Sequence, residues 1–501
     1  MKSIEKIESV FTATFCRETQ CVPAELNERC LTVYSANPMD IFLKQRLEIL
    51  LGCSVDMRPA GDQEISDAFK KYSSKQDKLK GVSEGFKLEI AIGEGEEQRF
   101  QGLEELGDSG GPIVTLINTI ISTALKKRVS DIHIECYEKS VKVKYRIDGV
   151  LYPATEDLDP VHKAALASRL KVMAELDIAE TRVPQDGRFK LRLGARYIDF
   201  RLSVVPSLFG ENIVIRILDN QGARDARSAL SIDDMGFSGE QRNVFIKAIN
   251  EPHGMVLITG PTGSGKTTTL YAAIAEINNG MQKIVTIEDP VEYQLDGIMQ
   301  IPVNAKKGLT FASGLRSILR HDPDRILVGE IRDKETADIA IQSALTGHLV
   351  FSSVHANNAI DVLARLQNIG VGIGNCLSAI NCIVSQRLLR LNCTHCARRV
   401  TYDNAVLESS GLALSADQAP MLMRGQGCDN CAMTGYSGRT MICEMLMVTD
   451  AVRENLLESG ISAELLRKME LVGNTSLRLA ALQKVHEGRV SLEEANRVTF
   501  N

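Results

Sequence analysis

The segment from Gly260 to Thr267 reads GPTGSGKT and fits the complete phosphate-loop pattern G-x-x-x-x-G-K-[ST]. A short apolar strand pattern, residues 255–259, precedes it, and residues 268–277 have a helical pattern. Glycines let backbone N–H groups turn inward around a phosphate, and the following helix adds the positive end of its dipole. A glycine-rich turn without a ligand is the alternative, but the coincidence of motif, strand and helix disfavours it.

This loop predicts a site for ATP and Mg²⁺. We expect Lys266 to reach the β- and γ-phosphates and the Thr267 hydroxyl to ligate Mg²⁺. From about residue 231 onward, apolar strands alternate with helices, which is typical of a parallel sheet with crossover helices. The residues expected around the phosphates are Gly260, Pro261, Thr262, Gly263, Ser264, Gly265, Lys266, Thr267 and Thr268.

Carboxylates that hold the metal and orient water should follow downstream strands. Glu288 and Asp289 follow the apolar run IVTI, and Glu330 follows RILVG. Because Gly329 occupies the place where an aspartate would normally face the metal, we expect Glu330 to be the base or water-positioning residue. Glu288 and Asp289 are then candidates for the metal-side carboxylate. For all three, capping of the next helix is the alternative.

Two histidines flank the apolar run of residues 349–354. His348 precedes this run and His355 follows it. Either could contact the γ-phosphate, and the residues alone do not decide between this role and a structural one.

Two C-x-x-C pairs, Cys393/Cys396 and Cys428/Cys431, have the spacing of a closed tetrahedral zinc site. The polar insert between the pairs would be fixed by the metal. Free thiols are the alternative. The other cysteines are scattered, and we expect most of them to be small buried residues.

The composition excludes several classes of protein. The formal net charge is −6 and aromatic residues make up 5% of the chain, which argues against a globally basic nucleic-acid binder and against an aromatic stacking platform. The N-terminal residues lack the apolar region of a secretion signal. Two uncharged runs, residues 339–360 and 366–386, carry too many polar side chains for a membrane span. We therefore expect a cytoplasmic protein that reaches a membrane through a partner.

Four sequence elements stand in order: GPTGSGKTTTLY, TIEDPVE, ILVGEIRD and TGHLVFSSVHAN. This series resembles the Walker A, Asp box, Walker B and His box of the secretion ATPases, the hexameric motors of bacterial type II secretion and type IV pilus assembly. The resemblance continues upstream through VSDIHIE, RIDG and RVPQDGR, and it covers residues 109–450. The resemblance implies that a glycine at the Walker B position of Gly329 is usual in this family, and it favours a functional role for His348.

The resemblance implies a multidomain α/β motor with a RecA-like P-loop ATPase domain and an inserted Cys₄ zinc subdomain. It also implies a homo-hexamer in which a PAS-like α+β module packs on a neighbour's ATPase domain and presents arginines to its nucleotide. The expected positions are Arg188, Arg201 and Arg216. Exposed arginines on a hydrated strand face are the alternative for each.

The first residues resemble the single adaptor module of type II secretion motors, which docks on the cytoplasmic part of a single-span inner-membrane protein. Some pilus motors instead carry repeated Arg- and Leu-rich motifs that bind a cyclic dinucleotide, and we find no such motif and expect no such site. The expected order is an adaptor at 1–75, a linker at 76–108, an α+β module at 109–220, the ATPase core at 221–390, the zinc subdomain at 391–440 and a helical region at 441–501.

These expectations describe a Mg²⁺-dependent hexameric ATPase, attached to the inner membrane through platform and adaptor proteins, that drives (pseudo)pilus assembly and protein export by type II secretion. A type IV pilus extension ATPase is the nearest alternative. A DNA-translocating motor would be stimulated by DNA and would bind it in a salt-dependent way, but no nucleic-acid partner is expected. A non-enzymatic, nucleotide-gated scaffold would show no turnover.

Overall fold

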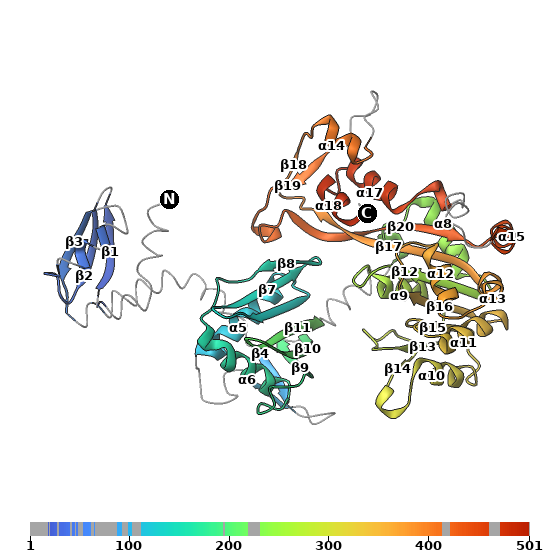
Figure 1. The fold of residues 1–501 in the computed structure, drawn as a ribbon, viewed down its shortest axis with the longest axis horizontal. Helices are drawn as coiled ribbons and strands as arrows, with labels where there is room; N and C mark the ends of the chain where they lie inside the picture. Colours follow the sequence, from blue (N-terminus) through green and yellow to red (C-terminus); the bar gives the residue numbers. More distant parts are fainter. Residues whose placement is uncertain are drawn as a thin grey trace. The chain divides into compact units, whose positions relative to one another are not determined.

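The computed structural model describes most of the chain from residue 112 onward and shorter stretches before it (Figure 1). The contacts divide the chain into two compact units. The second unit holds residues 129–159, 182–188 and 196–501, and the first holds the rest. This division does not follow the expected domain boundaries, which stay predictions. The described residues are 19, 21–27, 30–40, 43–45, 47–48, 54–61, 65, 88–92, 99–102, 112–193, 196–218, 231–412, 421–459 and 471–499.

Three strands form a small sheet near the N-terminus: β1 (Cys21–Asn27), β2 (Cys30–Ser35) and β3 (Ser54–Pro59). Strand β2 is central, antiparallel to β1 and parallel to β3. The alternate side chains of Leu31 and Val33 are buried, which gives this sheet an apolar face.

A second sheet has the order β5-β4-β9-β10-β11-β6-β7-β8. Its strands β4 (Leu88–Ile92) and β5 (Arg99–Gly102) lie inside the stretch expected to be a linker. The run LEIAI has a strand composition, but the charged residues around it dominate the sequence pattern. The other strands are β6 (Asp131–Cys136), β7 (Val141–Ile147), β8 (Val150–Pro153), β9 (Gln185–Leu193), β10 (Arg196–Ser207) and β11 (Gly210–Leu218).

The hairpin predicted at Asp148-Gly149 joins β7 to β8, and both residues have a positive φ, as such a turn requires. Two longer helices belong to the same stretch of sequence, α5 (Pro112–Lys126) and α6 (Lys163–Met173), and they contact each other.

The third sheet carries the phosphate loop and has the order β14-β13-β15-β16-β12-β17-β20. All neighbours are parallel except β17 and β20, so the predicted parallel α/β architecture is confirmed. The strands are β12 (Gly254–Thr259), β13 (Ile284–Glu288), β14 (Met299–Pro302), β15 (Arg325–Val328), β16 (Leu349–Val354), β17 (Ile380–Asn392) and β20 (Tyr436–Met447).

Both faces of this sheet are covered, which explains why its central strands are apolar throughout. Met255 and Leu257 of β12 belong to one buried cluster, whereas Val256 and Ile258 belong to another. The surrounding helices are α8 (Gly239–Ile249), α9 (Lys266–Ile277), α10 (Phe311–Ile318), α11 (Lys334–Leu345), α12 (Asp361–Asn368), α13 (Ile373–Ala379) and α15 (Asp450–Ser459).

Strand β17 continues beyond its pairing with β12 and forms a long hairpin with β20. Between these strands lie β18 (Ala397–Arg399), α14 (Asn404–Ser409) and β19 (Met423–Gly425). Helices α17 (Leu477–His486) and α18 (Leu492–Thr499) pack against the hairpin in a buried cluster that includes Leu389 and Ile442.

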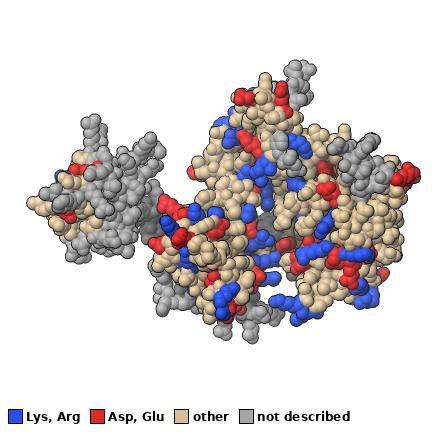
Figure 2. All heavy atoms as spheres, in the orientation of Figure 1, with Lys and Arg blue, Asp and Glu red and all other residues tan. Residues whose placement is uncertain are grey.

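None of the described helices is long and apolar enough to cross a membrane. On the face drawn in Figure 2, basic and acidic side chains are interspersed, in keeping with the small net charge.

Candidate nucleotide site and metal centre

The phosphate loop joins the buried strand β12 to helix α9, which begins at Lys266. Gly260, Gly263 and Gly265 have φ angles of 146°, 78° and 88°. Residues with a side chain rarely adopt this left-handed backbone, so the glycines give the loop its path. Thr267 is half-buried in the first turn of α9, whereas Pro261, Thr262 and Thr268 are exposed and Ser264 is buried.

The Lys266 side chain folds back over the loop. Its Nζ donates to the carbonyl oxygens of Gly260, at 2.9 Å, and of Pro261, at 3.2 Å. Burial lowers the pKa of Lys266, the Glu330 carboxylate opposes this shift, and Arg387 adds to it. A phosphate would supply the anionic partner that this ammonium group has only in part.

Glu330 lies at the carboxyl end of the sheet, on the segment that follows β15. Its carboxylate contacts Arg332 in a short ion pair and His355 at 3.2 Å. Burial alone would raise the pKa of Glu330, but Arg332 and His355 outweigh it and lower the pKa. Arg332 also lies 3.7 Å from Asp289. The edge therefore holds an ionised glutamate between two cationic or hydrogen-bonding neighbours.

The structure separates the two candidate histidines. His348 precedes β16, and its backbone carbonyl accepts a hydrogen bond from Gly254 at the start of β12. The His348 Nδ1 lies 3.0 Å from the carbonyl of Ser343. His348 thus sits at the edge opposite the phosphate loop, and the structure does not bring it to the loop of its own chain. His355, at the other end of β16, is the histidine beside Glu330.

The carboxylates of Glu288 and Asp289 lie in different surroundings. The buried Glu288 carboxylate accepts hydrogen bonds from Tyr271, Thr286 and Gln300. Both of its oxygens accept hydrogen bonds from neighbouring side chains, and its role toward the metal stays a prediction. The Asp289 side chain is 42% exposed and stays available for that role.

The predicted arginines come together. Arg188, Arg201 and Arg216 line one hollow of about 490 Å³. Arg201 and Arg216 are direct partners on β10 and β11, and Arg188 comes from β9. The Arg216 Nε donates to Asp131 at 2.9 Å. This cluster of cations is suited to an anionic group.

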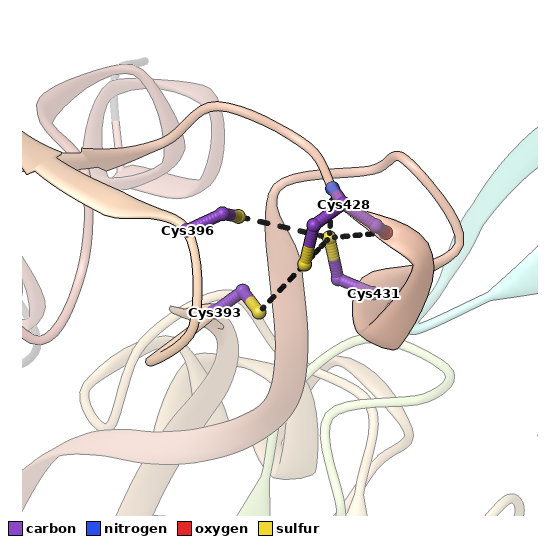
Figure 3. A group of neighbouring side chains, drawn as sticks. All are labelled: Cys393, Cys396, Cys428 and Cys431. Atoms are coloured by element: carbon purple, nitrogen blue, oxygen red, sulfur yellow. Dashed lines mark hydrogen bonds between the residues drawn. The ribbon is translucent and has the colours of Figure 1, made fainter.

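The four paired cysteines converge from two loops (Figure 3). The sulfur distances are 3.9 Å for Cys393–Cys428, 3.8 Å for Cys396–Cys431 and 3.7 Å for Cys428–Cys431. Zn–S bonds of about 2.3 Å place tetrahedral sulfurs about 3.8 Å apart, so the cluster fits zinc.

Backbone N–H groups surround these sulfurs. The amides of Cys428 and Gly435 donate to the Cys431 sulfur, and the amide of Gly427 donates to the Cys396 sulfur. Burial alone would raise the pKa of Cys431, but the amides of Cys428 and Gly435, with the neighbouring thiols, outweigh it and lower the pKa to about 7, whereas burial raises the pKa of Cys396 to about 11. Donors of this kind favour thiolates, the form that binds a metal.

Motif analysis missed three residues at the nucleotide site. Arg332 holds Glu330, and Gln386 and Arg387 of β17 lie beside the phosphate loop and the His355 loop. For Gln386 and Arg387, the only signal in the sequence is a run of three polar residues, Ser385 included, inside an otherwise largely apolar strand.

Fold and site together define a P-loop ATPase. The phosphate loop follows β12, the glutamate follows β15, and β16 lies between these two strands. The loop, its lysine and a carboxylate lie at one edge of this sheet, which is the arrangement expected of a nucleoside triphosphatase.

Comparison with known proteins identifies the family. A family model described as "Type II/IV secretion system protein" matches residues 107–497, and one described as "MshEN domain" matches residues 3–79. The type II secretion system protein E of Aeromonas hydrophila is 42% identical over 461 residues, which cover 89% of this chain and 88% of that protein. The type IV pilus assembly ATPase PilB of Acinetobacter baylyi is 46% identical over 392 residues, which cover 77% of this chain and 66% of that protein.

The chain therefore belongs to the type II/IV secretion system protein family. Among solved structures, the ATPase DotB of Legionella pneumophila is similar with a TM-score of 0.55 at 21% identity, covering 77% of this chain and 95% of that one. This likeness supports the fold. The predicted family and the predicted ATPase class are confirmed.

Proposed function

We propose that this chain is the ATPase motor of a type II secretion system, working as a hexamer on the cytoplasmic side of the inner membrane. The observation that carries the proposal is the Glu330 carboxylate, which contacts Arg332 and His355 at the edge of the sheet that bears the phosphate loop. The identity to type II secretion system protein E over most of both chains supports the choice of system.

At the site, the loop amides and Lys266 bind the phosphates of ATP. Thr267 and Asp289 offer the hard oxygen ligands that suit Mg²⁺, which neutralises phosphate charge when bound. Glu330 orients the attacking water and accepts its proton, and Arg332 and His355 hold Glu330 in place. Arg188, Arg201 and Arg216 supply positive charge to the nucleotide of a neighbouring subunit, a contribution of about 10³–10⁵ in rate for arginines of this kind.

The cysteine cluster holds a structural Zn²⁺ that fixes the tip of the β17–β20 hairpin. Residues 1–75 attach the motor to a single-span inner-membrane protein and so place it beside the secretion platform. The domain order given above, from adaptor to C-terminal helical region, is part of the same proposal.

The ATPase part is tested by two variants of the full chain. Lys266→Ala should lose ATP binding, whereas Glu330→Gln should bind ATP and lose hydrolysis. A wild-type protein with no turnover, or a Glu330→Gln protein with wild-type turnover, would contradict the proposal.

A role as a type IV pilus assembly ATPase is the second candidate, because PilB of Acinetobacter baylyi is 46% identical over the shared region. Capture of native membrane partners on the immobilised full chain separates the two, with mass spectrometry as the readout. Recovery of a single-span protein of a secretion system supports type II secretion. Recovery of a pilus platform protein instead would assign the chain to pilus assembly.

A further inference from the structure

Gln386 is the buried residue that meets the phosphate loop from the neighbouring strand. The register of β12 with β17 ends at the pair Thr259–Ser385, so Gln386 is the next residue along β17, level with the start of the loop. Its side chain is fully buried, and its Nε2 donates to the carbonyl oxygen of Ser264 at 2.8 Å.

Both ends of the loop lie close to Gln386. A Cβ atom added to Gly260 would lie 2.5 Å from the Gln386 carbonyl oxygen, and one added to Gly265 would lie 3.3 Å from the Gln386 Nε2. Only a glycine lets the backbone approach this closely at residue 260. The loop is therefore fitted against one side chain and one carbonyl of β17.

The residues on either side of Gln386 contact the loop that carries His355. Side chains alternate along a strand, so Ser385 and Arg387 point away from Gln386. Both donate to the carbonyl of Asn357, the serine hydroxyl at 3.4 Å and the arginine at 2.6 Å. This short stretch of β17 thus joins the phosphate loop to the loop whose histidine contacts Glu330.

Two polar atoms at this junction have no hydrogen-bond partner within the part of the chain that the structure describes. They are the Gln386 Oε1 and the Ser264 hydroxyl, and both are buried. One is an acceptor and the other can donate, and they belong to residues already joined by the bond from Gln386 to the Ser264 carbonyl. Buried polar groups normally have hydrogen-bond partners, so the Gln386 Oε1 and the Ser264 hydroxyl can each form a further hydrogen bond at the loop.

We propose that Gln386 is a positioning residue that holds the phosphate loop in its nucleotide-binding shape. The inference rests on the proposed ATPase function and adds a residue outside the loop motif to it. Gln386 does not touch the nucleotide in this account. It acts through the Ser264 carbonyl, and it sets the fraction of molecules whose loop is ready to bind ATP.

The test replaces Gln386 by methionine, which keeps the length of the side chain and removes the amide. The expected result is a five- to tenfold rise in the KM for ATP, about the contribution of one buried hydrogen bond, with kcat within about twofold of wild type. A purely structural loss would reduce the amount of active protein, which lowers kcat and leaves KM unchanged.

Gln241 provides a matched control. It is also a buried glutamine, its Nε2 donates to the carbonyl of Cys443, and Cys443 is the β20 partner of Gln386. Gln241→Met should lower the thermal unfolding temperature and leave the KM for ATP within about twofold.

A wild-type KM in Gln386→Met, or an equal rise of KM in Gln241→Met, would overturn the inference. If Gln386→Met does not fold, Gln386→Asn takes its place, because its shorter amide should fail to reach the Ser264 carbonyl, and the same change in KM is expected. Wild-type protein is assayed alongside. Turnover by wild type with an unchanged KM in the variant contradicts only the role of Gln386, whereas absence of turnover in wild type contradicts the ATPase function itself.

Discussion

At the scale of single residues, the nucleotide site depends on which side chains meet at the carboxyl edge of the parallel sheet. His355 meets Glu330 there, whereas His348 lies at the opposite end of the same strand. The sequence places both histidines next to β16 but contains no direct sign of which end faces the phosphates. The direction of the strand decides this, and it follows from the parallel pairing of β12 with β16.

We therefore predict that His355→Ala lowers kcat for ATP hydrolysis by roughly tenfold or more, because it removes a hydrogen-bonding partner of the Glu330 carboxylate. His348→Ala, made as the comparison, should have the smaller effect on kcat. Steady-state ATPase assays of both full-length variants give the answer. A larger loss of kcat at His348 would contradict the arrangement described for a single chain and would favour the role expected from the family.

Much of the site could be predicted from residue patterns, and the remainder depends on tertiary contacts. The phosphate loop and the cysteine pairs are local motifs, so their chemistry is visible in the sequence. Glu288 is a candidate metal ligand in sequence, and its hydrogen bonds from Tyr271 and Gln300, which are distant along the chain, follow from no local pattern. Gln386 lies in an apolar strand and is recognised only once that strand lies beside the loop.

At the scale of elements, the β17–β20 hairpin links the nucleotide site to the cysteine cluster. Gln386 near the middle of β17 contacts the phosphate loop, and Cys393 directly follows the end of the strand. The alternation of strands and helices in the ATPase core could be predicted from apolar runs, but neither the β17–β20 hairpin nor the strands inside the expected linker were predicted. Strand β5 pairs with β4, and β4 pairs with β9, about a hundred residues away in sequence. No local pattern encodes the pairing of β4 with β9.

The cysteine cluster predicts one zinc ion per chain, measured by elemental analysis of the purified protein. Cys428→Ser should lose the metal because it removes one of four ligands. Cys382→Ser is the control: Cys382 is fully buried in the sheet and lies outside the cluster, so this variant should retain the metal. Wild-type protein without zinc, or Cys428→Ser with a full equivalent of zinc, would contradict the assignment.

Helix α18 is held to β17 by a buried ion pair whose stability depends on pH. Arg390 and Arg497 donate to Glu494, at 2.7 Å and 2.6 Å. Burial alone would raise the pKa of Glu494, but the two arginines outweigh it and lower the pKa to about 2. Because the folded pKa lies below the unfolded one, the stabilisation is complete above about pH 4.5 and is lost as the pH falls toward 2.

Full protonation of Glu494 would lower the free energy of unfolding by something on the order of 3 kcal/mol. Urea unfolding of the C-terminal region should show that the free energy of unfolding of the wild type falls steeply between pH 7 and pH 3. In Glu494→Gln this free energy should be lower at pH 7 and should fall less steeply. Glu493→Gln is the matched control, because the Glu493 carboxylate, next to Glu494 in sequence, is 42% exposed and pairs with Arg424. An unchanged pH dependence in Glu494→Gln would refute this account.

At the scale of the whole molecule, we propose that a neighbouring subunit completes the active site of this ATPase. The phosphate loop and Glu330 belong to one sheet, whereas the three arginines line a hollow formed by the strands of another. The family and the parallel ATPase fold follow from sequence motifs, but assembly between chains depends on surfaces that no motif describes.

The most direct test mixes two variants that are each inactive alone. One is Glu330→Gln, and the other is whichever of Arg188→Ala, Arg201→Ala and Arg216→Ala abolishes hydrolysis. In a randomly mixed ring, about a quarter of the sites combine an intact glutamate with an intact arginine from the neighbour, so the mixture should recover about a quarter of wild-type ATPase activity. A mixture that stays inactive, or three arginine variants that all keep full activity alone, would contradict the central claim.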